Sequence, residues 1–218
     1  MNLVEYNLSE LRKEIVPYNP KIIAVTKYFG ADKLIEAYQC GMRDFAENRV
    51  QDALEKFSNL PEDIRTNSTF HLIGHLQSNK VKKAVGTFDL IQSVDSLKLA
   101  KAISDEAIKQ GIVQNVLLQV NNAKEEAKSG FDVDELKLNF AEILSLKGIN
   151  VMGLMNIAPI TDEDNLVNLF SGMQALKAEL ENQFDCELKE LSMGMSGDYK
   201  VAVKFGSTMI RIGRKLFT

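Results

Sequence analysis

Cysteine and histidine are scarce in this chain, which has two of each among its 218 residues. Cys40 and Cys186 form no C-x-x-C pair and do not have the spacing of metal ligands. Two thiols cannot form a disulfide scaffold for a chain of this length. We therefore expect both cysteines to be free, partly buried thiols.

Long hydrophobic runs and strongly basic segments are also missing. No eighteen apolar residues run together, and the N-terminus has no basic stretch followed by an apolar core. The longest basic cluster, "NKVKK" at 79–83, has no interleaved aromatic residues, and the net charge is −4. These absences argue against a membrane span, a secretion signal and nucleic acid as a main partner. With 45% apolar and 26% charged residues, we expect a soluble, cytoplasmic protein.

The G-x-G-x-x-G fingerprint that follows the first strand of a doubly wound dinucleotide-binding sheet is absent as well. What the chain contains is a regular alternation of short β-rich runs with amphipathic helical segments. The eight β-rich runs are residues 21–26, 42–46, 69–74, 89–94, 114–120, 150–156, 188–193 and 207–212.

Helical periodicity fills the intervals between these runs and is clearest at 133–143 and 166–184. A further helix precedes the first strand, where apolar residues recur at helical spacing over 8–15. Eight strands that alternate with eight helices predict an α/β fold, a parallel (β/α)8 TIM barrel formed as one domain by residues 1–218. An open doubly wound sheet is the rival, and it would normally have fewer strands.

Polar residues follow the C-terminal ends of the predicted strands, where the chemistry of such barrels collects. They are Lys27, Glu47, Asn48, His71, His75, Ser93, Asp95, Gln119, Asn121, Asn156, Ser192, Arg211 and Gly213. So many polar side chains at one end of a barrel predict a pocket. For Asp95, Asn121 and Asn156 the alternative is that they only cap the helices that follow.

The last two loops predict a phosphate site, because phosphate sites in this fold are commonly built after the seventh and eighth strands. The stretch "SMGMSGDYKVAV" places Ser196 at the expected start of a helix, where free amides and the helix dipole favour an anion. The stretch "RIGR" adds the amides of Gly213 and Arg214. The alternative is that Ser196 only caps its helix and that the arginines are solvated. The carboxylate of Asp198 would repel a phosphate unless it points away.

Lys27, at the end of the first strand, suggests a ligand that carries both a phosphate and a carbonyl group. Pyridoxal 5′-phosphate (PLP) is such a ligand, because its aldehyde forms a Schiff base with a lysine amine and its phosphate needs an amide cradle. Arg211 is the expected partner of the pyridine nitrogen. An arginine keeps its proton in proteins, so it would leave that nitrogen unprotonated and weaken the ring as an electron sink.

The two histidines raise the question of a metal site, because His71 and His75 lie four residues apart and face the same side if both are on a strand. Their surroundings contain neither a third ligand nor an H-E-x-x-H motif, so zinc is disfavoured. We expect His71 to lie beside the cofactor ring, and His75 to start the loop or bind its backbone.

One set of motifs runs in order over nearly the whole chain: "AVTK", "FAENRVQDALEK", "FHLIGHLQSNKVK", "SVDS", "LLQVN" with "EEAKSGF", "GLMNIAP", "LSMGMSGDY" and "GSTMIRIG". Together they resemble the pyridoxal phosphate homeostasis proteins, the single-domain relatives of alanine racemase. The resemblance implies a barrel like the racemase N-terminal domain, with PLP in Schiff linkage to Lys27. It also implies that the phosphate is held around Ser196 and Gly213, with Arg211 near the pyridine nitrogen.

The same resemblance implies a role in vitamin B6 and amino-acid homeostasis, without an established enzymatic reaction. The candidate cofactor-binding residues are Lys27, Asn48, His71, Ser192, Ser196, Arg211, Gly213 and Arg214. The family frequently has threonine where this chain has Arg214, so the grip on phosphate is expected to differ here.

Two functions are open at this point: a PLP carrier, and a PLP-dependent amino-acid racemase with weak activity. Racemisation needs a second acid or base, which related racemases take from a C-terminal β domain, and this sequence stops five residues after Gly213. Neither Tyr28 nor Tyr199 has a placement that argues for this role. We therefore favour a monomeric carrier that is not an enzyme, with apo PLP-dependent enzymes as acceptors.

Overall fold

The computed structural model describes residues 2–123 and 129–218, over which helices and strands alternate. The strands are β1 (Lys21–Val25), β2 (Asp44–Glu47), β3 (Thr69–Leu72), β4 (Leu90–Val94), β5 (Gln114–Val120), β6 (Ile149–Asn156), β7 (Glu190–Met195) and β8 (Met209–Ile212). The α-helices are α1 (Leu3–Glu14), α2 (Ala31–Gln39), α3 (Val50–Ser58), α4 (Glu62–Thr66), α5 (Val81–Ala84), α6 (Leu97–Gln110), α7 (Val133–Leu144), α8 (Glu163–Phe184), α9 (Tyr199–Ala202) and α10 (Arg214–Phe217). Short 3-10 helices are η1 (Ser78–Lys80) and η2 (Val203–Phe205).

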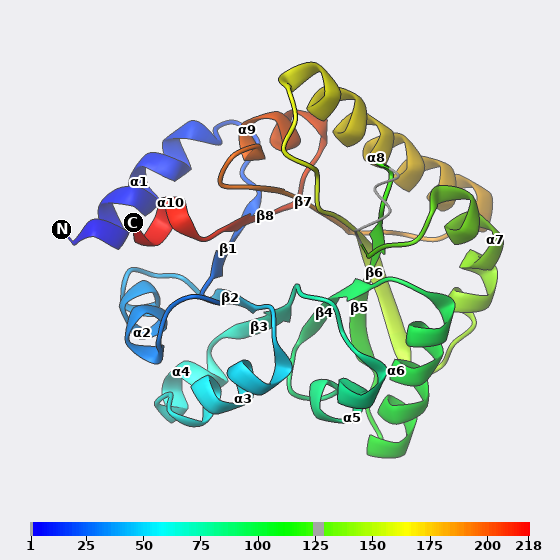
Figure 1. The fold of residues 1–218 in the computed structure, drawn as a ribbon, viewed down its shortest axis with the longest axis horizontal. Coiled ribbons are helices and arrows are strands. Elements are labelled where there is room, and N and C mark those ends of the chain that lie inside the picture. The colour runs from blue at the N-terminus through cyan, green and yellow to red at the C-terminus, as the bar shows by residue number, and fades with distance from the viewer. Residues whose placement is uncertain (1, 124–128) are drawn as a thin grey trace.

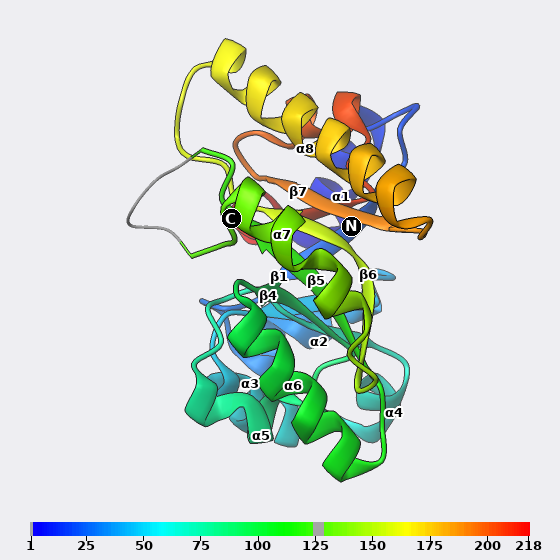
Figure 2. The ribbon, with the colours of Figure 1, turned by 90° about the vertical axis from the view of Figure 1, so that its right-hand side faces the viewer.

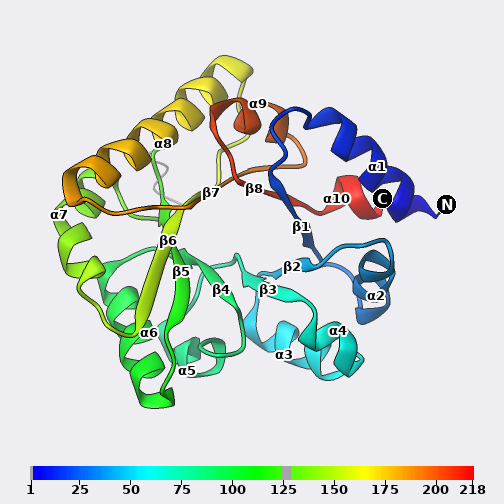
Figure 3. The ribbon, with the colours of Figure 1, turned by 180° about the vertical axis from the view of Figure 1, so that it is seen from behind.

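The eight strands form one closed barrel in chain order. β8 closes it by pairing in parallel with β1, with Lys21 beside Met209 and Ile23 beside Arg211. Figure 1 shows the helices in a ring around the strands, and Figure 3 shows the same ring from behind. The predicted (β/α)8 TIM barrel is therefore confirmed, and the rival open sheet is wrong.

All the predicted strands are present, with shifted ends in some of them. β7 runs on to Met195, although the sequence was interpreted as entering a loop near Gly194. Gly194 has a φ of +96°, and a Cβ atom at this position would lie 2.8 Å from the Cβ of Ala202. The glycine therefore does not end the strand, but permits the close approach of α9 to it.

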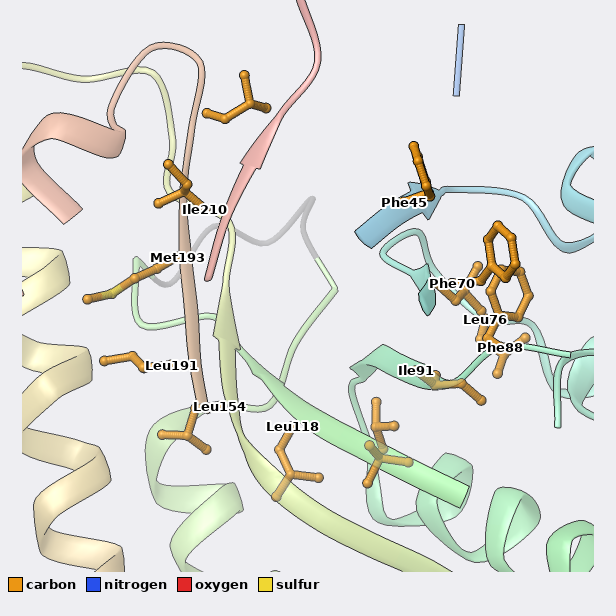
Figure 4. Close-up of a cluster of buried hydrophobic side chains, with 14 of the residues drawn as sticks. Phe45, Phe70, Leu76, Phe88, Ile91, Leu118, Leu154, Leu191, Met193 and Ile210 are labelled. Carbon is orange, nitrogen blue, oxygen red and sulfur yellow. The ribbon is translucent and has the colours of Figure 1, made fainter. Parts of the chain in front are cut away.

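Alternation along the strands separates two apolar clusters, one inside the barrel and one between the barrel and the helices. The inner cluster consists of Ile23, Val25, Ala46, Leu90, Leu117, Met155 and Met209. In the outer cluster, Phe45, Phe70 and Phe88 lie together in Figure 4. Because side chains fill the barrel interior, a ligand site is confined to one of its ends.

The ends of the longer helices follow local capping rules. At the start of α6, Ser96 Oγ accepts a hydrogen bond of 3.2 Å from the N–H of Leu99, and Gly111 ends the helix with a φ of +70°. Asp162 caps α8. Of the apolar face predicted from periodicity, Leu169 and Phe184 are partly buried, and the other members are buried: Leu166, Phe170, Met173, Leu176 and Leu180. Figure 2 shows α6 and α7 next to each other on the outside of the barrel.

The N-terminal helix was predicted from residues 8–15 and is present as α1, which begins earlier, at Leu3. It packs against α10, so the first and last helices lie side by side (Figures 1 and 3). The short helices α4 and α10 were not predicted. Within the part of the chain that the structure describes, no helix is long and apolar enough to cross a membrane.

Candidate cofactor site

A cavity of about 730 Å³ opens at the C-terminal end of the barrel. It brings together most of the predicted cofactor-binding residues, namely Lys27, Asn48, Ser196, Arg211, Gly213 and Arg214. His71 and Ser192 are not among the residues that line it. The structure therefore separates the predicted set into residues on the cavity wall and residues behind it.

Lys27 reaches the cavity because of its position after β1. Val25 belongs to the inner apolar cluster, and the alternation of a strand places Lys27, two residues later, on the same side. The side chain of Lys27 is half-buried, and its Nζ lies 5.0 Å from the ring centre of Tyr28. The strand β1 therefore places the amine of Lys27 at the cavity.

A buried ion pair joins the ends of β1 and β2 directly behind the cavity. Lys56 Nζ donates to Glu47 Oε1 and, at 2.8 Å, to the backbone oxygen of Thr26. Thr26 Oγ1 donates to the same Glu47 oxygen at 2.6 Å. Because Thr26 precedes Lys27 and Glu47 precedes Asn48, this cluster fixes the backbone just before two cavity residues.

The loops after β7 and β8 lie against each other at the cavity. Ser196 Oγ accepts a hydrogen bond of 3.5 Å from the backbone N–H of Lys215, and Gly213 and Arg214 line the cavity with Ser196. A Cβ atom on Gly197 would meet nothing within 4 Å, so there is open space beside this loop. The two loops therefore meet at one cavity, and the phosphate that they are expected to bind stays a prediction.

Asp198 turns part of its carboxylate towards the backbone of β7, where Oδ1 accepts a hydrogen bond from the N–H of Met195. Burial raises the pKa of Asp198, and this hydrogen bond and the charge of Arg211 oppose that shift. Helix α9 begins at Tyr199 with Asp198 at its N-cap position. The expectation that Ser196 caps this helix is therefore wrong.

A chain of hydrogen bonds leads from the cavity across the barrel interior. Arg211 Nη1 donates to Ser192 Oγ at 2.7 Å, and Ser192 Oγ donates to Gln92 Oε1 at 2.7 Å. Gln92 Nε2 lies 3.0 Å from His71 Nδ1, and His71 Nε2 lies 3.1 Å from Asp44 Oδ1. His71 and Ser192 are thus connected to the cavity through Arg211 and do not face it.

The residues at the two ends of this series of hydrogen bonds determine which atoms donate and which accept. Arg211 can only donate, and the carboxylate of Asp44 can only accept. The amide N–H of Gln92 therefore points at His71 Nδ1, and His71 carries its proton on Nε2, which donates to Asp44. With this assignment, each of the four hydrogen bonds between Arg211 and Asp44 has one donor and one acceptor.

Arg211 is a fixed cation on the cavity wall. Its side chain is buried, and Nη2 donates to the backbone oxygen of Asn156 at 2.7 Å. Burial lowers the pKa of Arg211 to about 10, and the carboxylate of Asp198 acts against that effect. The guanidinium therefore stays protonated at neutral pH and can only donate hydrogen bonds.

The capping alternative for Asp95, Asn121 and Asn156 is wrong, because other residues cap the helices that follow. The N-caps of α6, α7 and α8 are Ser96, Asp132 and Asp162. Asp95 Oδ2 lies 2.8 Å from His75 Nδ1, so His75 has a side-chain partner. Within residues 2–123 and 129–218, no group of three or more His, Cys, Asp or Glu side chains is placed to hold a metal ion.

Sequence reasoning missed two parts of this site. Residues 157–161, after β6, form one wall of the cavity, and Gln92 and Asp44 complete the hydrogen-bond chain. Gln92, within the predicted strand 89–94, was an available signal, since a buried polar side chain needs a partner. Asp44 and the wall carry no such signal. The first residues of the "EEAKSGF" motif, 125–128, lie outside the described residues.

Comparison with protein families matches residues 1–218 to the family described as "Alanine racemase, N-terminal domain". Curated relatives are named "Pyridoxal phosphate homeostasis protein". The relative from Synechocystis sp. is 39% identical over 206 residues, which cover 93% of this chain and 92% of that protein. The relative from Aquifex aeolicus is 38% identical over 198 residues, with coverage of 90% and 86%. The Escherichia coli K12 relative is 33% identical over 227 residues, with coverage of 100% and 97%.

Solved structures of similar fold include PipY of Synechococcus elongatus PCC7942, which is 39% identical and matches 99% of this chain and 100% of its own. The TM-score is 0.93 for PipY without PLP and 0.89 for PipY with PLP bound. An alanine racemase from Clostridium difficile 630 has a TM-score of 0.75 at 16% identity, over 98% of this chain and 55% of the racemase chain. At that identity the likeness shows the fold alone.

Proposed function

Because this chain belongs to the alanine racemase N-terminal domain family, we propose that it binds PLP and serves in intracellular PLP and amino-acid homeostasis. The observation that carries this proposal is the cavity, in which Lys27 and Arg211 share the wall with the loops at Ser196 and Gly213. The names of the curated relatives and the PLP bound in one PipY structure support the same ligand.

The cavity residues fit this cofactor. A volume of about 730 Å³ is within the range of small-molecule sites. Lys27 would hold the aldehyde carbon through a Schiff base, formed with the loss of one water. The backbone amides around Ser196, Gly213 and Arg214 would bind the phosphate, and the space beside Gly197 leaves room for it. When bound, PLP supplies an aldehyde that captures amines and a ring that can withdraw electrons.

Arg211 favours a carrier over an enzyme. Its guanidinium would donate to the pyridine nitrogen and, because it stays protonated, would leave that nitrogen without a proton. The ring is then a poor electron sink, which suits storage better than carbanion chemistry. In this proposal, His71 and Ser192 act indirectly, through the hydrogen-bond chain that holds Arg211. Asn48 lines the cavity itself.

The exposed rim of the cavity supports the proposal that the bound cofactor can exchange. Tyr28 is 78% exposed, and Ile160, in the wall loop 157–161, is fully exposed. We propose apo forms of PLP-dependent enzymes as acceptors, and a cytoplasmic monomer as the working form. Size-exclusion chromatography with light scattering should give a mass near 24.4 kDa, and a mass of twice that value would contradict the monomer.

Borohydride reduction tests the role of Lys27. Reduction of protein that has been incubated with PLP should fix the cofactor, and peptide mapping should place the label on Lys27. The Lys27→Ala variant should lose the label, whereas Lys33→Ala, which removes a surface lysine paired with Glu36, should keep it. A label on a different lysine in the wild-type protein would overturn the assignment.

Weak racemase activity is the second candidate. The sequence indicated no acid–base role for Tyr28, but its ring lies beside Lys27 on the cavity wall, where its phenol is available as an acid–base group. A carrier should transfer PLP to an apo-enzyme without converting free amino acids. Racemisation of any common amino acid that Lys27→Ala and Tyr28→Phe both abolish would favour the enzyme instead.

A further inference from the structure

Glu14 lies at the end of α1, outside the cavity, and contacts both of the short helices that follow the cavity loops. The hydroxyl of Tyr199, in α9, donates to Glu14 Oε2. Lys215 Nζ, in α10, lies 2.9 Å from the same oxygen, and Lys200 Nζ lies 3.3 Å from Oε1. One carboxylate from the first helix thus holds α9 and α10 together.

These contacts are made close to the predicted phosphate-binding loops. Tyr199 is buried and follows Asp198 directly, so it sets the end of the loop at 196–198. Lys215 is the second residue after Gly213, and its backbone N–H reaches Ser196 Oγ at 3.5 Å. A movement of either helix would therefore change the spacing of the amides on the cavity wall.

The electrostatics of this cluster keep it intact at neutral pH. Burial alone would raise the pKa of Glu14, but hydrogen bonds from Tyr199, Lys215 and Lys200 lower it to about 2. Burial and the hydrogen bond to Glu14 raise the pKa of Tyr199, so the phenol keeps the proton that it donates. Glu14 is therefore an anion that accepts hydrogen bonds, and Tyr199, Lys200 and Lys215 donate them.

We infer that Glu14 is a positioning residue for phosphate: it sets the distance between the loops at 196–198 and 213–214, and so the grip on the phosphate group of the ligand. This inference rests on the proposed function. A purely electrostatic role would act in the opposite direction, because removal of a negative charge near an anion site favours the anion. The sign of the effect therefore separates the two roles.

The test compares PLP with pyridoxal, which has the aldehyde and ring but no phosphate. Dissociation constants for both would be measured by absorbance for the wild type, Glu14→Gln and Glu10→Gln. Glu10 is on the same helix and has an exposed ion pair with Lys13, so it controls for the chemical change. Glu14→Gln should weaken PLP binding about tenfold and leave pyridoxal binding unchanged. The amide loses the negative charge and replaces one of the two acceptor oxygens by a donor, so hydrogen bonds to a charged group are lost. Glu10→Gln should change neither constant.

A second variant, Tyr199→Phe, removes one donor to Glu14 and keeps the lysine contacts. It should also weaken PLP selectively, by a smaller factor, and it keeps the test decisive if Glu14→Gln unfolds. Equal losses for both ligands, an unchanged PLP constant or tighter PLP binding would overturn the inference. If the wild type itself bound PLP and pyridoxal equally, the phosphate loops of the proposed function would be wrong, which is a distinguishable result.

Discussion

At the scale of single residues, the buried ion pair of Lys56 and Glu47 matters for stability. The side chains are 10% and 1% exposed, and the pair also binds Thr26 through its backbone oxygen and its hydroxyl. Each charge is tolerated because the other lies beside it. The same pair holds the strand ends that carry Lys27 and Asn48, so its loss would affect both the fold and the cavity.

We predict that Lys56→Met destabilises the protein by about 3–5 kcal/mol, because it leaves the carboxylate of Glu47 buried without a cation. The double variant Lys56→Met with Glu47→Leu should recover most of that loss, since no isolated charge remains. Urea unfolding of the single and double variants gives both values.

The matched control for this cycle is Lys33→Met, which breaks a partly exposed surface ion pair with Glu36. It should cost less than about 1 kcal/mol, as is usual for surface pairs. If Lys56→Met lowered the free energy of unfolding as little as this control, the ion pair of Lys56 and Glu47 would not be buried.

At the scale of elements, the ends of neighbouring strands approach one another closely around the cavity. A Cβ atom at Gly74, just after β3, would lie 2.1 Å from the backbone oxygen of Asn48, just after β2. Only glycine leaves space for this contact between backbones. The position of Asn48 on the cavity wall therefore depends on a residue that has no side chain.

Gly74→Ala should destabilise the protein by about 1–3 kcal/mol, because the end of β2 must move to accommodate the added methyl group. It should also weaken PLP retention, since Asn48 moves with the strand end. Urea unfolding and cofactor titration would measure the two effects.

Gly172→Ala is the control for the chemical change. Gly172 is exposed within α8, and a Cβ atom there would come no closer than 3.5 Å to Asn122. This substitution should stabilise the protein by up to about 1 kcal/mol, because alanine favours helix. Loss of stability in both variants would mean that the contact with Asn48 is not the cause.

At the scale of the whole molecule, the first helix holds the end of the chain in place. α1 lies beside α10 (Figure 1). The side chain of Glu14 connects α1 to Tyr199 and Lys215. The first and last elements therefore meet twice: β1 pairs with β8 in the barrel, and α1 packs against α10 outside it.

This arrangement predicts a loss of stability in acid. The pKa of Glu14 is about 2 in the folded protein and about 4.3 in an unfolded chain. The contribution of Glu14 to stability is therefore complete above the unfolded value and disappears as the pH falls towards the folded one. The difference in unfolding free energy between the wild type and Glu14→Gln should shrink from pH 5 to about pH 2. A difference that stays constant over this range would contradict the ion cluster.

The sequence allowed the barrel and six residues of the cavity wall to be predicted, because the strands and the residues that follow them are recognisable from local patterns. Lys27 and Gly213 follow apolar strands, and the ends of parallel strands share one side of a barrel. His71 and Ser192 were expected at the cavity, and the structure places them behind it. How far these two side chains lie from the open end of the barrel depends on the stagger of the strands. In β7 the pairing with β8 shifts register between Ser192 and Met195, and no local sequence pattern indicates such a shift.

The sequence by itself determined the alternation of strands and helices, since side-chain periodicity is a property of neighbouring residues. It also determined that an amine, a guanidinium and glycine-containing loops follow strand ends. Only the tertiary structure decided which distant groups meet, such as Arg211 with Ser192 and Glu14 with Tyr199. The physical reason is that these contacts are set by the closure and stagger of the barrel, which result from the packing of the whole chain.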